Sequence, residues 1–359
     1  SAFDNGNGTY TVSCEDGTSF TVSDGQDVTR SNDTLLTRID DPDPSLGCVA
    51  GGRVISYGLD NGDGDGISAN GNLESGEIDT STTLCSTMSF GLFRDINLGS
   101  GSSNPTYFTI LDDERVIFSA DDGESGRELW VLRPETGSVA MVKDIRDGYA
   151  SSNLNHFTEM NGEVYFSAND GEHGNELWKT DGTEEGTNMI KDLNNNGDSS
   201  GNPYGFTEFN GELYFVAYDG ETGWELWKTN GTEEGTVKVR ENIYSSSDFS
   251  VFGDYLYFGG SESTYGQELW KTDGTEEGTT MVKDIRDGSA SSYPSAFTEF
   301  NGELYFHAND GVTGYELWKT DGTSIGTILV ADISEDGSSY PSDFAVFNGE
   351  LYFHANDGV

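Results

Sequence analysis

The chain has 359 residues, of which 64 are Asp or Glu and 18 are Lys or Arg, so its formal net charge is −46. A surface of this charge repels phosphate backbones and anionic lipid headgroups, which argues against nucleic-acid binding. No run of 18 or more apolar residues is present, so no segment is predicted to insert into a membrane.

Residues 1–89 do not repeat, and they contain the three cysteines of the chain, Cys14, Cys48 and Cys85. In a secreted chain, an odd number of cysteines indicates one disulfide plus one further thiol, or a link between two chains. Glycosylation sequons fit surface loops. They begin at Asn7, Asn32 and Asn230.

A series of short motifs follows Cys48. The sequence reads Cys-x-x-Gly-Gly at 48–52, an Asp/Asn/Gly-rich loop at 60–66, Gly-Glu at 76–77, Ser-Thr at 81–82, and then Cys85. This order resembles a small module found in secreted bacterial proteins. The resemblance implies a Cys48–Cys85 disulfide. Such a bridge would close a loop of about 37 residues and contribute about 3–4 kcal/mol by restricting the unfolded chain.

The acidic loop of this module resembles a calcium loop of the EF-hand type, in which ligands alternate and a carboxylate closes the site at position 12. The spacing departs from that pattern, because position 12 counted from Asn61 is Asn72, and Glu77 falls one place late counted from Asp65. The predicted calcium ligands are Asp60, Asp63, Asp65 and Glu77, with Asn61 as an additional candidate. The alternative is a plain acidic, glycine-rich loop.

From residue 90 onward the sequence is built from repeats. The tripeptide Glu-Leu-Trp recurs five times, and its tryptophans are Trp130, Trp178, Trp227, Trp270 and Trp318. Lys-Thr-Asp-Gly-Thr follows at 179–183, 271–275 and 319–323, with Asn230 replacing the Asp at 228–232. Phe-Asn-Gly-Glu-Leu-Tyr-Phe precedes it at 209–215 and 300–306 and recurs at 347–353, with looser copies at 112–118, 160–166 and 252–258.

The repeat chemistry predicts β-hairpins. Asn-Gly between alternating apolar residues favours a type I′ turn, so 297–300 should pair with 303–308. Further strands are predicted at 315–320, with Leu317 and Trp318 on opposite faces, and at 328–333. Four strands in about 48 residues match one blade of a β-propeller. The repeated aromatics are then core residues, with an exposed sugar-binding platform as the alternative, and Trp224 lies outside the repeated position and is expected at the surface.

The repeat also resembles a known family. Glu268 to Thr279, followed by Met281-Val282-Lys283-Asp284-Ile285, is similar to the ELWxxDGT repeat of bacterial extracellular proteins, and the resemblance covers residues 90–359. It implies a propeller-like secreted or cell-surface protein and no established reaction. The turns at 122–123, 170–171, 219–220 and 310–311 align between repeats and are explained as tight turns, with one bound cation per blade as the alternative.

Catalytic motifs are not found in the sequence. His307 and His354 occupy the same repeat position, where other copies have Ser167 or Val216, so they are interpreted as structural. No zinc-binding His spacing, nucleophile elbow or phosphate-binding glycine loop is present. A carboxylate pair for glycoside hydrolysis could be hidden among the 64 acidic residues. The protein is therefore predicted not to be an enzyme.

Together these patterns predict an all-β protein: a β-propeller over 90–359, whose sixth copy is incomplete, preceded by a small disulfide-stabilised module over 1–89. The open strand edges of this copy could be closed by the N-terminal strands expected around 9–13 and 19–23, or by a neighbouring chain through strand exchange. Truncation of the sequence explains the incomplete copy equally well. The predicted function is an extracellular structural or adhesive protein that self-assembles, stabilised by calcium, into a surface layer or filament. The alternatives are a glycan- or ligand-binding propeller and, less favoured, a secreted hydrolase. Expected partners are further copies, other cell-surface components or glycans.

Overall fold

The computed structural model describes the strands of residues 1–93 together with Ile78, and the segments 94–98, 100–245, 248–335 and 337–359. Every regular element in these residues is a β-strand. The chain divides into two compact units, residues 1–93 and residues 94–359. Among the described residues there is no helix with the length and apolarity needed to cross a membrane.

Unit 1 contains two antiparallel sheets of three strands each, in the orders β1-β2-β3 and β4-β5-β6. The first sheet consists of β1 (Ala2–Asp4), β2 (Thr9–Ser13) and β3 (Ser19–Ser23). The second consists of β4 (Leu35–Asp40), β5 (Gly52–Leu59) and β6 (Thr80–Cys85).

Unit 2 is a series of antiparallel sheets, called blades 1 to 6 here. Blade 1 has β7 (Thr106–Ile110), β8 (Val116–Asp121), β9 (Arg127–Arg133) and β10 (Ser138–Lys143). Blade 2 has β11 (Asn155–Met160), β12 (Glu163–Asn169), β13 (Asn175–Thr180) and β14 (Asn188–Lys191). Blade 3 has β15 (Tyr204–Phe209), β16 (Glu212–Tyr218), β17 (Trp224–Thr229) and β18 (Val237–Lys238).

The remaining blades follow the same plan. Blade 4 has β20 (Ser250–Phe252), β21 (Tyr255–Ser261), β22 (Glu268–Thr272) and β23 (Thr280–Lys283). Blade 5 has β24 (Ser295–Phe300), β25 (Glu303–Asn309), β26 (Tyr315–Thr320) and β27 (Ile328–Ala331). Blade 6 has β28 (Ser342–Phe347) and β29 (Glu350–His354). A short strand, β19 (Tyr244–Ser245), pairs with both β17 and β21 and so joins blades 3 and 4.

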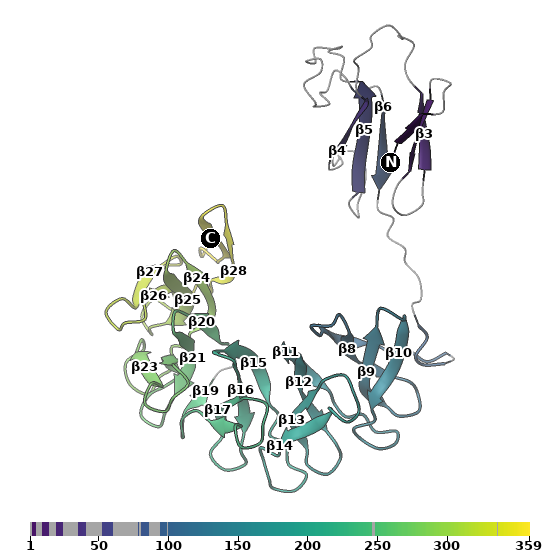
Figure 1. The fold of residues 1–359 in the computed structure, drawn as a ribbon. Coiled ribbons are helices and arrows are strands. Elements are labelled where there is room, and N and C mark those ends of the chain that lie inside the picture. Colours follow the sequence, from purple (N-terminus) through teal and green to yellow (C-terminus); the bar gives the residue numbers. More distant parts are fainter. Residues whose placement is uncertain are drawn as a thin grey trace. The chain divides into compact units, whose positions relative to one another are not determined.

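The blades lie side by side in chain order (Figure 1). Their first strands adjoin one another, because β11 contacts both β7 and β15, and β24 contacts both β20 and β28. Within a blade the strands pair in chain order as consecutive antiparallel neighbours. Four-stranded sheets stacked in this way are propeller blades, so the predicted all-β propeller fold is confirmed.

The predicted hairpins are also present. Asn301 and Gly302, between β24 and β25, have φ angles of 53° and 76°, and a type I′ turn requires positive φ at both positions. One boundary differs from the prediction, since β27 ends at Ala331 rather than at residue 333. The strand stops there because the Ile333 N–H donates to the Glu316 carboxylate, 2.9 Å away, instead of to a neighbouring strand.

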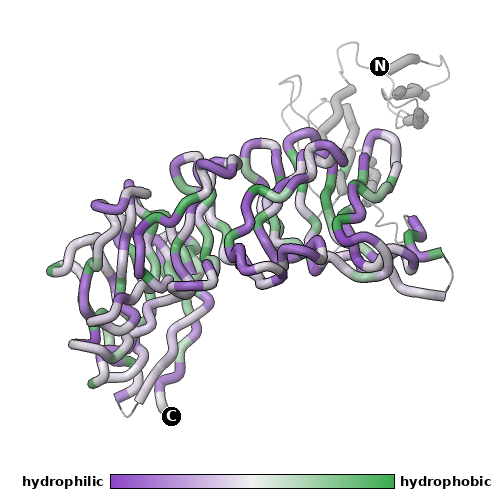
Figure 2. Tube along the Cα trace, turned by 90° about the horizontal axis from the view of Figure 1, so that it is seen from below, coloured by the Kyte–Doolittle hydropathy of each residue, from purple (hydrophilic) through white to green (hydrophobic). Residues whose placement is uncertain are grey.

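The Leu and Trp of each Glu-Leu-Trp point to opposite faces and connect successive blades. Leu129 of blade 1 and Trp178 of blade 2 belong to one buried cluster. The same arrangement recurs between Leu177 and Trp227, and on to the later blades. From blade 1 to blade 5, the leucine face of each blade is therefore buried against the tryptophan face of the next one. Figure 2 shows the hydrophobic residues along the strands and hydrophilic residues in many connecting loops.

The glutamate of each Glu-Leu-Trp is fully buried and accepts backbone hydrogen bonds from the loop that leads to the next blade. Glu176 Oε2 accepts from the Leu193 N–H at 2.7 Å, and its Oε1 accepts from the Gly201 N–H at 2.6 Å. Both of these amides lie beyond the last strand of blade 2, so a single carboxylate holds the connection between two blades. The equivalent residues that bond in the same way are Glu128, Glu268 and Glu316.

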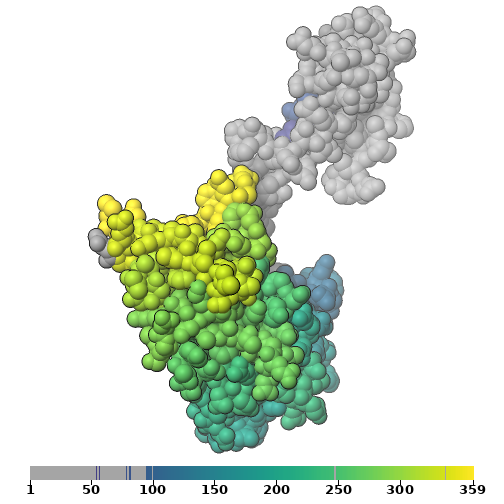
Figure 3. All heavy atoms as spheres, turned by 90° about the vertical axis from the view of Figure 1, so that its left-hand side faces the viewer, coloured from purple at the N-terminus to yellow at the C-terminus, as the bar shows by residue number. Residues whose placement is uncertain are grey.

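The Asp-Gly-Thr turns of blades 2, 4 and 5, and the Asn-Gly-Thr turn of blade 3, each pack on the preceding blade. Asp273 accepts hydrogen bonds from the Thr275 N–H at 2.9 Å and the Thr275 hydroxyl at 2.7 Å, which closes the turn. A Cβ on Gly274 would overlap the hydroxyl of Tyr214 in blade 3. Lys283 Nζ of blade 4 donates to the Thr327 carbonyl of blade 5 at 2.7 Å. On the face drawn in Figure 3, these contacts leave the blades packed against one another in chain order.

The first prediction concerns Gly274, whose φ is +93°. Gly274→Ala should destabilise the protein through backbone strain of about 1–3 kcal/mol and through overlap with Tyr214, which adds about 1–3 kcal/mol. Gly288→Ala is the matched control, because Gly288 has a φ of +91° but no atom within 4 Å of the added Cβ. Urea unfolding of both variants measures the difference. Equal losses of stability would show that the Tyr214 contact is unimportant.

The second prediction concerns pH. Burial raises the pKa of Glu128 and Glu176 to about 7, although backbone N–H groups oppose that shift. Because the folded-state pKa lies above the unfolded value, the folded protein binds these protons more tightly. The resulting stabilisation is complete below pH ~4.5 and is lost as the pH rises through about 7. Each unit of pKa difference corresponds to about 1.4 kcal/mol.

Turn aspartates act in the opposite direction at lower pH. Burial tends to raise the pKa of Asp122 and Asp310, but backbone N–H bonds lower it overall, so their stabilisation is lost in acid. The melting temperature should therefore rise from pH 8 to pH 5 and fall below pH ~4. Glu176→Gln should reduce the dependence of the melting temperature on pH between pH 5 and 8. Glu172→Gln, which changes an exposed residue, should not. An unchanged slope in Glu176→Gln would contradict this assignment.

Candidate functional site

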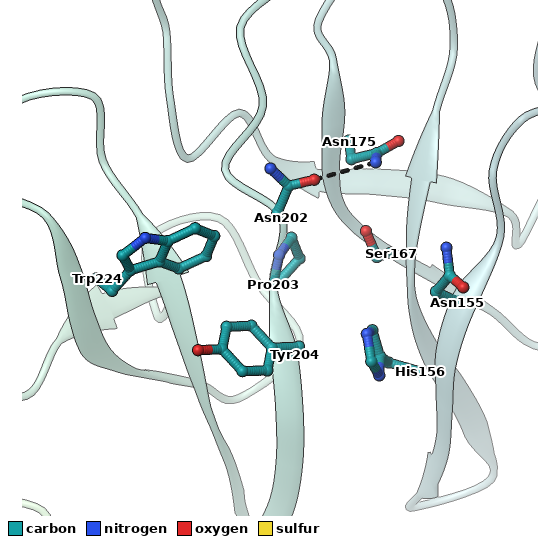
Figure 4. A pocket seen from close by; sticks show the side chains of 8 residues that line it. All are labelled: Asn155, His156, Ser167, Asn175, Asn202, Pro203, Tyr204 and Trp224. Atoms are coloured by element: carbon teal, nitrogen blue, oxygen red, sulfur yellow. Dashed lines mark hydrogen bonds between the residues drawn. The ribbon is translucent and has the colours of Figure 1, made fainter. Parts of the chain in front are cut away.

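A small cavity lies between blades 2 and 3 (Figure 4). Its volume is about 130 Å³, and none of its lining residues is an acid, a lysine or an arginine. The lining residues are Asn155, His156, Ser167, Asn175, Asn202, Pro203, Tyr204 and Trp224. The site therefore combines aromatic rings with side-chain amides inside a protein whose surface is otherwise strongly acidic.

Trp224 and Tyr204 form one wall of the cavity. Trp224 is 41% exposed, as its place outside the repeated tryptophan position predicted, whereas the five repeated tryptophans are buried. Its ring meets Tyr204 edge to face, with centroids 5.5 Å apart, and lies 5.8 Å from the ring of Tyr218. Trp224 begins β17 and Tyr204 begins β15, so two strand ends of blade 3 supply this aromatic wall.

The opposite part of the cavity is made of amides. Asn175 Nδ2 donates to Asn202 Oδ1 at 3.0 Å, which fixes both side chains (Figure 4). Asn175 Oδ1 is fully buried and has no hydrogen-bond partner. Asn155 is already satisfied, since its Oδ1 accepts from the Tyr107 hydroxyl and its Nδ2 donates to the Asn153 carbonyl. The amide wall thus offers one enclosed acceptor without a donor, an arrangement that costs free energy unless a ligand supplies the donor.

His156 lies at the edge of the cavity, at a backbone irregularity of β11. Its φ is +58°, and the pairing register of β11 with β12 shifts between Asn155 and Thr158. The ring is 6.1 Å from that of Tyr204. Partial desolvation lowers the pKa of His156, so the imidazole is neutral at neutral pH. It can donate or accept one hydrogen bond without adding charge to the site.

The cavity exists because one repeat position is variable. The residue before Glu-Leu-Trp differs in all five blades: Arg127, Asn175, Trp224, Gln267 and Tyr315. In blade 1, Arg127 Nη1 fills the corresponding space by donating to the Asn104 carbonyl at 2.7 Å and to Ser119 Oγ at 3.1 Å. Only residues that depart from the repeat can create a feature unique to one pair of blades, and Asn175 and Trp224 both do so.

The histidines do not form a catalytic group in the described part of the chain. His307 Nε2 bonds with Ser295 Oγ and its Nδ1 with the Pro341 carbonyl, each at 2.7 Å, so it links blades 5 and 6. His173 Nδ1 pairs with Asp170 Oδ2 at 2.7 Å in blade 2. No three His, Cys, Asp or Glu side chains among the described residues are placed to hold a metal ion.

The predicted sites of unit 1 lie outside the described residues. They are the calcium ligands Asp60, Asn61, Asp63, Asp65 and Glu77, and Cys48 of the disulfide. Cys85 ends β6, but its side chain is not described. Calcium binding, the disulfide, secretion, self-association and glycan partners all stay predictions. Sequence reasoning missed the buried glutamates, although a carboxylate fixed beside two apolar residues in every repeat was the available signal.

Comparisons with known proteins do not identify a family for this chain. No family model and no curated protein matches the chain, so its resemblance to the ELWxxDGT repeat stays a prediction. Among solved structures, it is similar to a puromycin hydrolase mutant at 12% identity, with a TM-score of 0.43, over 96% of this chain and 54% of that one. A prolyl endopeptidase structure matches at 11% identity, with a TM-score of 0.45, over 85% and 48% of the two chains.

A third structure is a propeller alone. The β-propeller domain of the trilobed protease from Pyrococcus furiosus matches at 13% identity, with a TM-score of 0.38, over 89% of this chain and 93% of that one. The chain thus spans about half of the hydrolase and endopeptidase chains and nearly all of the isolated propeller. Likeness at these identities shows the fold alone.

The comparisons correct the predicted function. A non-enzymatic structural or adhesive protein was expected, with a lectin-like propeller as its alternative and a secreted hydrolase as a less favoured one. The similar solved chains reported above instead come from a hydrolase and from peptidases. The prediction failed because repeated residues report on the scaffold, and a propeller scaffold is compatible with many functions. The absence of an enzymatic role is likewise not established, and a propeller by itself need not be catalytic.

The third prediction tests the exposure of Trp224. Acrylamide should quench mainly this residue, because the other five tryptophans are at most 9% exposed. Trp224→Phe should therefore remove most of the quenchable fluorescence and leave the melting temperature nearly unchanged. Trp270→Phe, at a position only 2% exposed, is the control and should lower the total emission without lowering its quenchable share. Strong quenching that persists in Trp224→Phe would contradict the described cavity.

Proposed function

We propose that unit 2 is a recognition module that binds one residue of a peptide segment in the cavity between blades 2 and 3. The observation that carries the proposal is the enclosed, unpartnered Oδ1 of Asn175 in the amide wall that lies opposite Trp224 and Tyr204. A peptide N–H supplies a single donor flanked by apolar groups, which matches one acceptor in a cavity that also has an aromatic wall. Pairing this acceptor would contribute about 0.5–1.5 kcal/mol in addition to the contact with the rings.

The size of the cavity supports a chain ligand rather than a free small molecule. Pockets for drug-sized ligands have volumes of about 300–1,000 Å³, and this cavity has about 130 Å³. It therefore accommodates one side chain or one peptide group, with the rest of the ligand outside. Edge-to-face aromatic walls such as that of Trp224 and Tyr204 suit an apolar or aromatic side chain.

Charge further restricts the ligand. The site itself is uncharged at neutral pH, so it provides no counter-ion for a charged group. The protein around it has a net charge of −46, which disfavours acidic peptides, nucleic acids and acidic polysaccharides at low ionic strength. The proposal is therefore restricted to peptides that are neutral or basic overall and that place an uncharged residue in the cavity.

The fourth prediction tests this function. An array of acetylated, amidated hexapeptides that varies one position at a time should contain sequences that bind the protein and change the Trp224 fluorescence. Trp224→Ala and Asn175→Ala should each weaken binding of the best peptide at least about tenfold, or about 1.4 kcal/mol. Gln267→Ala changes the same repeat position in blade 4 and should leave the affinity within about twofold.

Two outcomes would contradict the proposal. In the first, no peptide binds, while a neutral oligosaccharide binds and is lost in Trp224→Ala, which would assign the cavity to sugars. In the second, peptides bind equally well to the wild type and to both variants, which would place peptide recognition elsewhere. Melting temperatures of all variants show whether lost binding reflects unfolding.

A further inference from the structure

An ammonium group is held among carboxylates in blade 3. Lys238 Nζ lies 2.5 Å from Asp219 Oδ2, 2.6 Å from Glu225 Oε2 and 3.2 Å from Glu241 Oε2. The hydroxyl of Thr222 adds a fourth oxygen at 3.1 Å. The Lys238 side chain is only 15% exposed and that of Glu225 is fully buried, so this ion pair is largely removed from water.

Blade 5 carries the same oxygen-bearing groups without the lysine. Pairing of Trp227 with Lys238 in blade 3 corresponds to pairing of Trp318 with Leu329 in blade 5. By the same register, Asp310, Thr313 and Asp332 occupy the places of Asp219, Thr222 and Glu241. Leu329 in blade 5 therefore takes the strand position that Lys238 has in blade 3, and the surrounding carboxylates remain.

A cavity is open beside this place in blade 5, where Thr313 and Asp332 belong to its wall. Its volume is about 550 Å³, much larger than that of the cavity between blades 2 and 3. It is lined by Arg286, Asn309, Gly311, Val312, Thr313, Gly314, Asp332, Glu335 and Gly337. The residues that surround Lys238 Nζ in blade 3 thus have counterparts that line or adjoin an open cavity in blade 5.

Two carboxylates, Asp332 and Glu335, line this cavity, and a third, Asp310, lies between the lining residues Asn309 and Gly311. Asp310 Oδ1 accepts from the Val312 and Thr313 N–H groups, each at 2.8 Å, which leaves Oδ2 without a hydrogen-bond partner in the described residues. Asp332 and Glu335 form no ion pair there either. Glu316 differs from its counterpart Glu225, because the Ser339 hydroxyl and two backbone N–H groups already satisfy it. A cation would therefore meet Asp310, Asp332 and Glu335 rather than Glu316.

Arg286 is the one cationic residue in the cavity wall. Its Nη1 donates to the Ser291 carbonyl at 3.3 Å, and its side chain packs beside Gly311. It forms no ion pair with a described carboxylate, so the wall holds two acids, Asp332 and Glu335, and one guanidinium. Arg286 leaves the cavity with a net negative charge and provides a donor for a carbonyl oxygen next to the bound cation.

We propose that the blade 5 cavity binds the primary ammonium group of a lysine side chain in a partner polypeptide, as blade 3 binds its own Lys238. A lysine side chain supplies three N–H donors on a flexible stem, which matches Asp310 Oδ2, Asp332 and Thr313. This cavity shares no lining residue with the Trp224 site, so the inference can be tested independently of the function proposed for that site. The net charge of −46 steers a basic partner toward it.

The fifth prediction uses two small probes that differ in the ammonium group alone. N-acetyl-lysine N-methylamide should bind at low salt and shift the amide resonances of Thr313 and Gly314. N-acetyl-norleucine N-methylamide should bind at least about tenfold more weakly, because charge-assisted hydrogen bonds contribute about 1.5–3 kcal/mol. Salt at about 0.5 M shortens the Debye length to a few ångströms, so it should weaken binding of the lysine probe.

Substitutions identify the cavity. Leu329→Lys places an ammonium where Lys238 lies in blade 3, so it should fill the cavity and weaken the lysine probe at least about tenfold. Val330→Lys adds the same charge at the neighbouring, 42% exposed position and should change binding by no more than about twofold. Asp332→Asn should also weaken binding, which keeps the test valid if Leu329→Lys fails to fold. Trp224→Ala should have no effect on this probe.

Three results would overturn the inference. One is equal binding of the lysine and norleucine probes. Another is lysine binding that survives both Leu329→Lys, in a folded protein, and Asp332→Asn. The third is displacement of the lysine probe by calcium chloride at concentrations too low for general screening, which would make the cavity a site for divalent cations.

Discussion

The structure of unit 2 depends on one buried interaction, the carboxylate of each Glu-Leu-Trp accepting backbone N–H groups from the loop that leads to the next blade. Burying a carboxylate is costly unless its oxygens are satisfied. In Glu176 the Leu193 and Gly201 amides satisfy both oxygens, and blade 2 is thereby connected to blade 3. The leucine and tryptophan beside it then point to opposite faces, so three consecutive residues connect a sheet to both neighbours and to its own exit loop.

Blade 3 shows how the same scaffold tolerates a change. Its loop supplies the Asn242 N–H to Glu225 Oε1, and the ammonium of Lys238 neutralises Oε2. The other described blades have Met or Leu at this strand position and use a second backbone N–H instead. The loop and the lysine are therefore alternative solutions to one electrostatic requirement. Blade 5 is informative because it keeps counterparts of all three carboxylates that surround the ammonium in blade 3, namely Asp310, Glu316 and Asp332, but lacks the lysine.

Function in this fold is expected where the repeat is broken. A residue present in every blade has to serve packing at every interface, so it cannot mark a single site. The cavity between blades 2 and 3 arises because the variable position before Glu-Leu-Trp holds Asn175 in one blade and Trp224 in the next. The repeated motif alone does not predict this cavity. The predicted structural or adhesive role rested on the repeated residues, and this is why it could be wrong although the predicted strand pairing within the blades is right.

The sequence by itself determined the blades, because hairpin turns, strand alternation and aromatic positions are local properties that recur every 43–49 residues. It also indicated that Trp224 is exposed, since that residue lies outside the repeated position. Only the tertiary structure decided which groups share a cavity. The unpartnered Oδ1 of Asn175, and the correspondence of Lys238 with Leu329, depend on how neighbouring strands and blades align. Such contacts join residues that are distant in the sequence, as Asn175 and Asn202 are, and local sequence preferences do not specify them.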